Sequence, residues 1–171
     1  MNIILITQND PFYLSEAIND FLLKLKNSDK HKIVKAIVSN PSPYGKNSSF
    51  LNKTFKTLKI FGPNFFFFYT LKFIHSFFLK KSVIQILKDY GVKTMHLKKN
   101  INNHYYEKKI KTLNPDIIII IAGNVLIKKN ILEIPKFGVI NAHSSLLPKY
   151  RGLMPTFWVL RNNEKVTGVT V

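Results

Sequence analysis

The sequence predicts an α/β domain with an open, mostly parallel sheet and helices on both faces. Three observations carry this prediction. Short apolar runs alternate along the chain with segments whose apolar residues recur at helical spacing. Residues 117–121 are five consecutive isoleucines, a run typical of a strand covered on both faces. The 171 residues contain no internal repeat and no low-complexity linker, so we predict one domain over residues 1–171.

The first half of the chain contains two predicted strands. Residues 2–7 are a short apolar run before the turn-forming Gln-Asn-Asp-Pro, and residues 33–38 are a second run before Ser-Asn-Pro. The segments with helical character are 12–25, 50–60 and 65–80. The Lys- and Phe-rich stretch from 46 to 81 is predicted to form an inserted helical arm.

The second half continues the alternation of strands and helices. Helices are expected at 82–90, 104–113, 125–132 and 154–161, and strands at 92–97, 116–121 and 137–143. Gly91 and the pair Asn114-Pro115 follow two of these helices as stop signals. Trp158 shares the last helix with apolar neighbours, so we expect it to pack in the core. The chain finishes with VTGVTV, residues 166–171, which alternates like a strand.

The protein is strongly basic. It has 26 Lys+Arg against 9 Asp+Glu, which gives a net charge of +17. Such a domain often meets nucleic acid, a membrane surface or an anionic small molecule. The lysines are spread along the chain, however, and arginine occurs only at Arg151 and Arg161. Because base readout and planar phosphate binding favour arginine, much of the charge is expected to be solvated surface.

Residue counts also bear on metal binding and location. The chain has no cysteine, which excludes disulfides and thiolate metal sites. His31, His75, His96 and His104 are scattered without ligand spacing, and we predict no metal. The N-terminus has no basic start and no small-residue cleavage site, so we expect a cytoplasmic protein.

Residues 65–79, FFFFYTLKFIHSFFL, are the one candidate for membrane contact. The run is shorter than a spanning helix needs, and Lys72 and His75 interrupt it. We favour a helix packed on the core or on a neighbouring subunit, although the sequence does not predict an oligomeric state. The alternative is an interfacial helix on an anionic membrane, with Lys80 and Lys81 near the lipid headgroups.

The fold class predicts where a ligand would bind. In open parallel sheets, ligands lie beyond the carboxyl ends of the strands. Three loops leave such ends, at residues 8–11, 122–126 and 142–152. No Gly-x-Gly-x-x-Gly or phosphate-loop signature follows the first strand, so a dinucleotide or nucleoside triphosphate is not the expected ligand.

Asn141 and His143 are the best candidates for catalysis. They stand two residues apart at the end of a predicted strand, so alternation would put both side chains on one side. An Asn amide can donate a hydrogen bond to a developing oxyanion, and a His can move a proton near neutral pH. Together they suit attack on a carbonyl-like carbon. The alternative is that the pair only satisfies a turn or the core.

The surrounding sequence is similar to a known family. NAHSSLLPKYRG, then GLMPTFWVL, then TGVT, resembles the formyltransferases that use 10-formyltetrahydrofolate. The upstream PDIIIIIAGNVLIKKNILEIPKFGVIN resembles the family's strand, Ala-Gly turn and Ile-Leu-x-x-Pro segment. The resemblance is strong from 114 to 171 and only general from 1 to 113, where ITQNDPFYL looks like the opening of some members. It implies a Rossmann-like formyltransferase fold.

The resemblance implies a role for each matching residue. Asn141 would hold the formyl oxygen, and His143 would assist proton transfer as an amine attacks the formyl carbon. Apart from the resemblance, Asn9, Asp10 and Arg151 are predicted to bind the substrate, Arg151 because arginine suits an anionic group such as phosphate; its alternative role is to hold its own loop. Residues expected to line the pterin pocket are Gly123, Asn124, Val125, Leu126 and Ile127, with Leu146, Leu147 and Pro148 shaping the floor near the reacting carbon. The folate would be a consumed cosubstrate.

One family residue has no counterpart. Its third catalytic residue is an Asp shortly after the Thr-Gly-Val-Thr strand, whereas this chain stops at Val171 and has no Asp or Glu after Glu164. Asp10, Asp89 and Asp116 do not match that position. We therefore expect a catalytic domain that is incomplete at its C-terminus.

The predicted function is transfer of a formyl group to a primary amine. The acceptor is either a nucleotide-linked amino sugar, which the sequence slightly favours, or initiator methionyl-tRNA; glycinamide ribonucleotide is the family's third acceptor. Two alternatives stay open. The chain could be a basic module that binds RNA or an anionic membrane, or it could hydrolyse 10-formyltetrahydrofolate with water in place of the amine.

Overall fold

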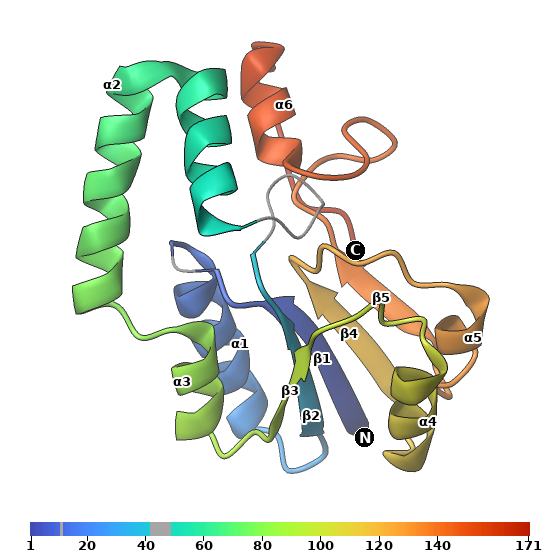
Figure 1. The fold of residues 1–171 in the computed structure, drawn as a ribbon. Helices are drawn as coiled ribbons and strands as arrows, with labels where there is room; N and C mark the ends of the chain where they lie inside the picture. Colours follow the sequence, from blue (N-terminus) through green and yellow to red (C-terminus); the bar gives the residue numbers. More distant parts are fainter. Residues whose placement is uncertain (11, 42–48) are drawn as a thin grey trace.

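A parallel sheet forms the centre of the molecule. The computed structural model describes residues 1–10, 12–41 and 49–171, so the first residues of the predicted arm, 46–48, lie outside the described part. The strands are β1 (Asn2–Gln8), β2 (Lys32–Ser39), β3 (Thr94–Leu97), β4 (Ile117–Ile121) and β5 (Val139–Ala142). They pair in the order β3-β2-β1-β4-β5, all parallel (Figure 1). The predicted α/β fold with a parallel sheet is confirmed.

Helices cover both faces of this sheet, as predicted. The elements are α1 (Leu14–Lys26) and α3 (Val83–Asp89) on one face, and α4 (His104–Thr112) and α5 (Lys129–Leu132) on the other. The first pair contributes buried side chains such as Ile18 and Leu87, and the second contributes Ile110 and Ile131. The sheet is thus buried between two apolar layers, which explains its uninterrupted apolar strands.

The isoleucine run serves both layers at once. Ile118 and Ile120 are buried in the layer under α4 and α5, whereas the alternate isoleucines of β4 pack against the layer under α1 and α3. Alternation of side chains across the strand produces this division. The prediction of a strand covered on both faces is confirmed.

Two further helices lie beyond the sheet. The helix α2 (Phe50–Leu79) has a kink at Gly62, whose φ of 79° is not helical, and Pro63 follows it. The predicted helices at 50–60 and 65–80 are therefore two halves of α2. The first half runs beside α6 (Pro155–Arg161), where the Phe61 and Phe157 ring centroids are 5.6 Å apart (Figure 1). Among the described helices, none is both long and apolar enough to cross a membrane.

The structure corrects four local predictions. Residues 125–128 are not helical, because Asn102 accepts from Lys128 N at 2.7 Å and donates to Leu126 O at 2.7 Å, which holds the segment extended. The strand predicted at 137–143 is only Val139–Ala142. In the 166–171 segment only Thr170 forms a β-bridge, to His143. Trp158 is 45% exposed rather than in the core, and Val159 is the buried residue of α6.

Candidate functional site

The three predicted ligand loops start at the carboxyl edge of the sheet, and residue 11 of the first loop lies outside the described residues. The strands β1, β4 and β5 are neighbours, and the register pairs Ile121 with Ala142. The loops that leave β4 and β5 therefore start side by side, and the loop after β1 starts next to them. Topology alone brings the sequence-predicted site residues to one edge, as parallel α/β sheets require.

His143 is oriented by its own loop. Its ring Nε2 lies 3.0 Å from the backbone oxygen of Tyr150. Because a carbonyl oxygen can only accept, Nε2 carries the hydrogen and Nδ1 is the ring nitrogen that remains to accept a proton. His143 is half-buried, and Asn141, at the end of β5, is exposed. One acceptor nitrogen and one amide therefore stand close together in the sequence at the open edge of the sheet.

Thr170 fixes the loop that carries His143. Its backbone pairs with that of His143 through N···O distances of 2.8 and 2.9 Å. Its Oγ1 donates to Ser145 O at 2.8 Å and accepts from Leu147 N at 3.1 Å. Ser145 is fully buried beneath this connection. Sequence reasoning gave Thr170 no role, and the only signal was its place in the Thr-Gly-Val-Thr motif.

The remainder of this loop is also held by short-range contacts. Arg151 Nε donates to Pro148 O at 3.1 Å, so the loop-holding role predicted for Arg151 is present, and its substrate-binding role stays a prediction. The Leu147–Pro148 peptide is cis, and the side chains of Leu146 and Leu147 are 47% and 44% exposed. A Cβ at Gly168 would lie 2.8 Å from Leu146 Cδ2, so glycine permits the close approach of the two segments.

Glu164 anchors the far end of the loop. It accepts from Tyr150 Oη at 2.7 Å and from Lys149 Nζ at 3.1 Å. The Tyr150 hydroxyl and the Lys149 ammonium lower the pKa of Glu164 from its ordinary 4.5. The same hydrogen bond to Glu164 raises the pKa of Tyr150 above its ordinary 10.0. The carboxylate and the neutral phenol therefore stabilise each other.

This anchor predicts how the loop responds to pH. Because the folded pKa of Glu164 is lowered, its contribution is fully present above pH 4.5 and is lost as the pH falls through the folded value. Because the folded pKa of Tyr150 is raised, its contribution is present below pH 10.0 and is lost as the pH rises through the folded value.

We expect the fluorescence of Trp158, the only tryptophan, to change in both pH ranges, and both changes to shrink in Glu164→Gln. The matched control is Glu133→Gln, which removes an exposed carboxylate at the C-terminal end of α5. An unaltered acid transition in Glu164→Gln, with the control also unaltered, would contradict the assignment.

The loop after β4 borders a pocket. The cavity has a volume of about 530 Å³, within the usual range for small-molecule sites. Asn124, Val125 and Leu126 line it together with the ends of β2 and β3. Asn124 Oδ1 accepts from Ser39 Oγ at 3.0 Å, which joins this loop to β2. Gly123 fits tightly, because a Cβ there would lie 2.5 Å from Ile120 Cγ2.

The lining of the pocket is also basic. It includes Lys98, Lys99 and Lys128, and no Asp or Glu is among its lining residues. A cavity lined by amide and lysine side chains suits an anionic or carbonyl-rich small molecule. The pocket lies on the side of the β4 loop that faces β3.

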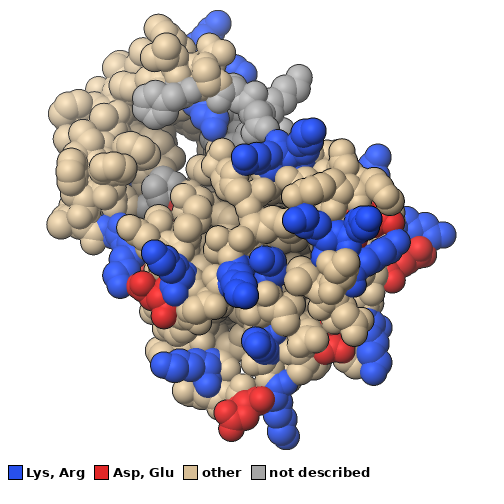
Figure 2. Space-filling model, turned by 60° about the horizontal axis from the view of Figure 1, so that its bottom comes forward, with Lys and Arg blue, Asp and Glu red and all other residues tan. Residues whose placement is uncertain are grey.

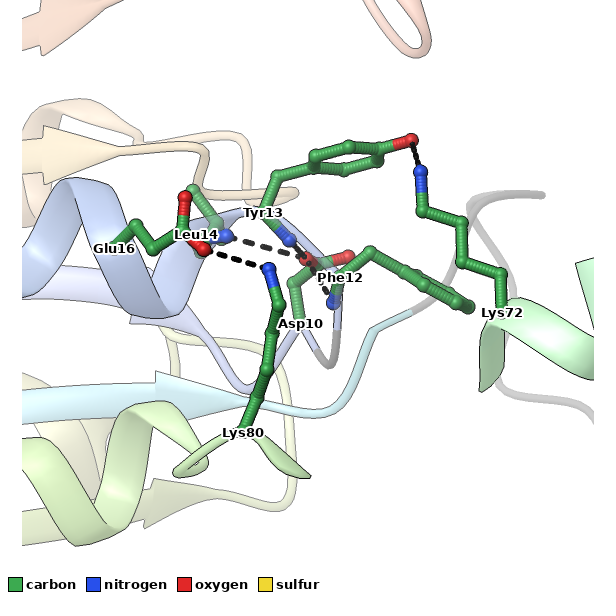
Figure 3. A network of polar contacts seen from close by, with 7 residues as sticks. All are labelled: Asp10, Phe12, Tyr13, Leu14, Glu16, Lys72 and Lys80. Carbon is green, nitrogen blue, oxygen red and sulfur yellow. Dashed lines mark hydrogen bonds and ion pairs between the residues drawn. The ribbon is translucent and has the colours of Figure 1, made fainter. Parts of the chain in front are cut away.

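The loop after β1 has a structural role of its own. Asp10 Oδ1 accepts from the backbone amides of Phe12, Tyr13 and Leu14 at 2.9, 2.7 and 3.3 Å (Figure 3). It thereby satisfies amides at the start of α1 that have no helical partner. Asn9 N donates to Ser39 O at 2.9 Å, while Asn9 Oδ1 is buried without a partner among the described residues. Substrate binding by Asn9 and Asp10 stays a prediction.

We expect Asp10→Ala to lower the free energy of unfolding by about 0.5–2 kcal/mol, because three amides lose their acceptor. Urea denaturation of the purified protein measures this change. Asp10→Asn keeps an acceptor and should retain most of the stability. Asp20→Ala, at an exposed position on the same helix, should stay within about 0.5 kcal/mol of the wild type. Equal losses in Asp10→Ala and Asp20→Ala would argue against a capping role.

Comparisons with known proteins agree on one family. The family model described as Formyl transferase matches residues 15–171. Among curated proteins, the chain is 59% identical over 63 residues to the methionyl-tRNA formyltransferase of Thermodesulfovibrio yellowstonii. It is 60% identical over 62 residues to that of Clostridioides difficile. These matches cover 37% and 36% of this chain, and 20% of each relative. The chain thus spans about a fifth of the length of the curated relatives it matches.

Solved structures show the same fold. The phosphoribosylglycinamide formyltransferase from Bacillus halodurans has a TM-score of 0.62 at 16% identity, covering 98% of this chain and 69% of that chain. Glycinamide ribonucleotide transformylase 1 from Geobacillus kaustophilus also has a TM-score of 0.62, at 14% identity, covering 99% of this chain and 71% of that one. The likeness therefore includes residues 1–113, where the motifs alone are weak.

Proposed function

Because the chain belongs to the formyl transferase family, we propose that it transfers a formyl group from 10-formyltetrahydrofolate to a primary amine. The observation that carries the proposal is the fixed orientation of His143. Its Nε2 is committed to Tyr150 O, so Nδ1 is available as a base, two residues along the chain from Asn141. The relatives and structural neighbours named above are formyltransferases, which supports an enzyme of this reaction class.

The chemistry follows from these two residues. The acceptor amine attacks the formyl carbon, and a new C–N bond forms while the carbonyl oxygen gains negative charge. The Asn141 amide donates a hydrogen bond to that oxygen, a contribution worth about 100- to 1,000-fold in rate. His143 Nδ1 takes the proton that the attacking nitrogen loses. The oxyanion then re-forms the carbonyl as the bond from the carbon to the folate N10 breaks. The proton held by His143 passes to N10, which leaves as tetrahydrofolate.

The pocket beside the β4 loop supports folate as the cosubstrate. A volume of about 530 Å³ and a wall of amides and apolar side chains suit a flat, polar heterocycle. Asn124, Val125 and Leu126 are the residues in this wall that we propose to contact the pterin. Gly123 and Ile127 would hold the loop from below. Leu146, Leu147 and Pro148 would cover the reacting carbon from the facing loop.

For the acceptor we propose the aminoacyl group of initiator methionyl-tRNA. The curated relatives that carry this activity in their name are 59–60% identical over their matched segments. The net charge of +17 also suits a polyanionic substrate. This proposal replaces the slight preference for an amino sugar that the loop sequence alone suggested.

One assay tests donor, acceptor and reaction class together. The protein that carries this sequence is incubated with 10-formyltetrahydrofolate and methionyl-tRNA, glycinamide ribonucleotide, a nucleotide-linked amino sugar or no amine. Formation of tetrahydrofolate and of formylated product is measured in each. We expect product with methionyl-tRNA and little tetrahydrofolate without an amine. Equal tetrahydrofolate release in all four samples, without formylated product, would establish hydrolysis instead of transfer.

A further inference from the structure

The second half of α2 exposes an apolar face to solvent. Phe67, Leu71, Ile74 and Phe78 recur at three- and four-residue spacing and are 67%, 51%, 47% and 77% exposed. Residues at this spacing lie on one side of a helix. Large apolar side chains gathered on one exposed face mark an interaction surface more often than single exposed ones do. We call these four residues the outer face of α2.

Part of the remaining surface of this helix packs against the start of α1. Phe12 packs against Tyr69 and Phe73, with ring centroids 4.6 and 6.1 Å apart. Lys72 contacts the Tyr13 hydroxyl, and Lys80 Nζ lies 2.6 Å from Glu16 Oε1 (Figure 3). These contacts attach α2 to the start of α1. Because these contacts fix the orientation of α2, the outer face of α2 points to solvent.

Charge determines which partner this face fits. Residues 30–88 contain no Asp or Glu, and the lysines of α2 are Lys53, Lys56 and Lys59 in its first half and Lys72 in its second half. Lys and Arg side chains are scattered over the surface in Figure 2 and outnumber the acidic ones. A second copy of the chain would bring another net charge of +17 to the interface, which opposes association. A partner with negative charge and an apolar interior suits both features of the surface.

A lipid bilayer fits these features better than RNA. Leu71 and Ile74 lie between the phenylalanines, and aliphatic side chains offer bases nothing to stack on. No arginine occurs before Arg151, although arginine is the residue best suited to RNA phosphates. From Pro63 to Leu79 the helix is about 25 Å long, shorter than the hydrocarbon core of about 30 Å. Such a helix lies in the interface rather than across it.

We propose that the outer face of α2 binds the surface of an anionic lipid bilayer. The apolar side chains enter the boundary between headgroups and acyl chains, and the net charge of +17 favours a surface of anionic headgroups. This proposal is independent of formyl transfer, because it uses neither the carboxyl edge of the sheet nor its loops.

The test compares two variants on vesicles. The purified protein is sedimented with vesicles of phosphatidylglycerol and phosphatidylcholine, and with vesicles of phosphatidylcholine alone. In the test variant, Phe67→Gln and Phe78→Gln are combined. In the control variant, Leu132→Gln and Phe137→Gln remove two exposed apolar side chains near α5, on the opposite face of the sheet. Circular dichroism verifies that both variants fold, as exposed substitutions should allow.

We expect the wild type to bind the anionic vesicles and the test variant to bind them about tenfold or more weakly, because two apolar contacts are lost. The control should stay within about twofold of the wild type. Equal binding by the test variant and the wild type would overturn the proposal. So would a stable dimer that dissociates in the test variant without any vesicle binding. RNA binding that depends on Phe67 and Phe78, with none to vesicles, would also overturn it.

Discussion

Replacing His143 by alanine is expected to lower the rate of formyl transfer by about 100- to 10,000-fold, the usual contribution of a general base. The variant should remain folded, because His143 is only half-buried and its side chain makes one hydrogen bond to the described residues, with Tyr150 O. The loop retains its backbone pairing with Thr170 in the absence of the ring. The measurement is kcat/KM for the acceptor that the assay identifies, with thermal unfolding recorded in parallel.

The control for this experiment is a histidine outside the site. His104, at the start of α4, has a side chain that is 87% exposed, and His104→Ala should transfer formyl groups at the wild-type rate. In Asn141→Ala the rate of formyl transfer should fall by about 100- to 1,000-fold if the Asn141 amide stabilises the oxyanion. Near-normal turnover in His143→Ala, with the fold intact, would remove His143 from the mechanism.

Replacing Thr170 by valine is the second large effect that we expect. Valine keeps the shape but leaves Ser145 O without its donor and Leu147 N without its acceptor. The Ser145 oxygen is part-buried, and leaving such a group unpaired costs about 1–3 kcal/mol, whereas water can bind the exposed Leu147 N. Because the same contacts position the His143 loop, a displacement of the reacting groups by about 1 Å would slow transfer by about a hundredfold.

Thr167→Val is the matched control for Thr170→Val. Thr167 lies in the same segment, is exposed, and its substitution should change neither stability nor rate by much. Thr170→Ser restores the hydroxyl and should recover most of the activity. A loss of stability in Thr170→Val without any loss of rate would show that Thr170 only supports the fold. Equal losses in the valine and serine variants would exclude the hydroxyl as the cause.

Local patterns predicted the sheet and its layers. The isoleucines of β4 are apolar without interruption because both sides of the strand are covered, and that burial is visible in the sequence itself. Gly62 and Pro63 likewise divide α2 where a pattern of two helices predicted a break. The order of the parallel strands then places Asn141 near the loop after β4 without further information.

The contacts that complete the site could not be predicted in this way, because they join distant residues. Residues 125–128 have the composition of a helix. The side chain of Asn102, in the loop before α4, instead forms hydrogen bonds with the backbone groups of Leu126 and Lys128. Thr170 and Glu164 contact the His143 loop from positions 25 and 14 residues away from their partners in the sequence. Helical or strand periodicity does not predict contacts between such distant residues. Trp158 was misplaced because helical spacing shows that a face is apolar without showing whether anything covers it.

The bridge between His143 and Thr170 has a consequence for the order of events on the ribosome. The strands that pair around β1 are all made before residue 143 leaves the exit tunnel, and their core can form as they emerge. The loop between β5 and α6 lacks its partner until residue 170 has also emerged. A nascent chain therefore has a folded sheet before it has an ordered His143. The part that would perform chemistry becomes rigid after the sheet does.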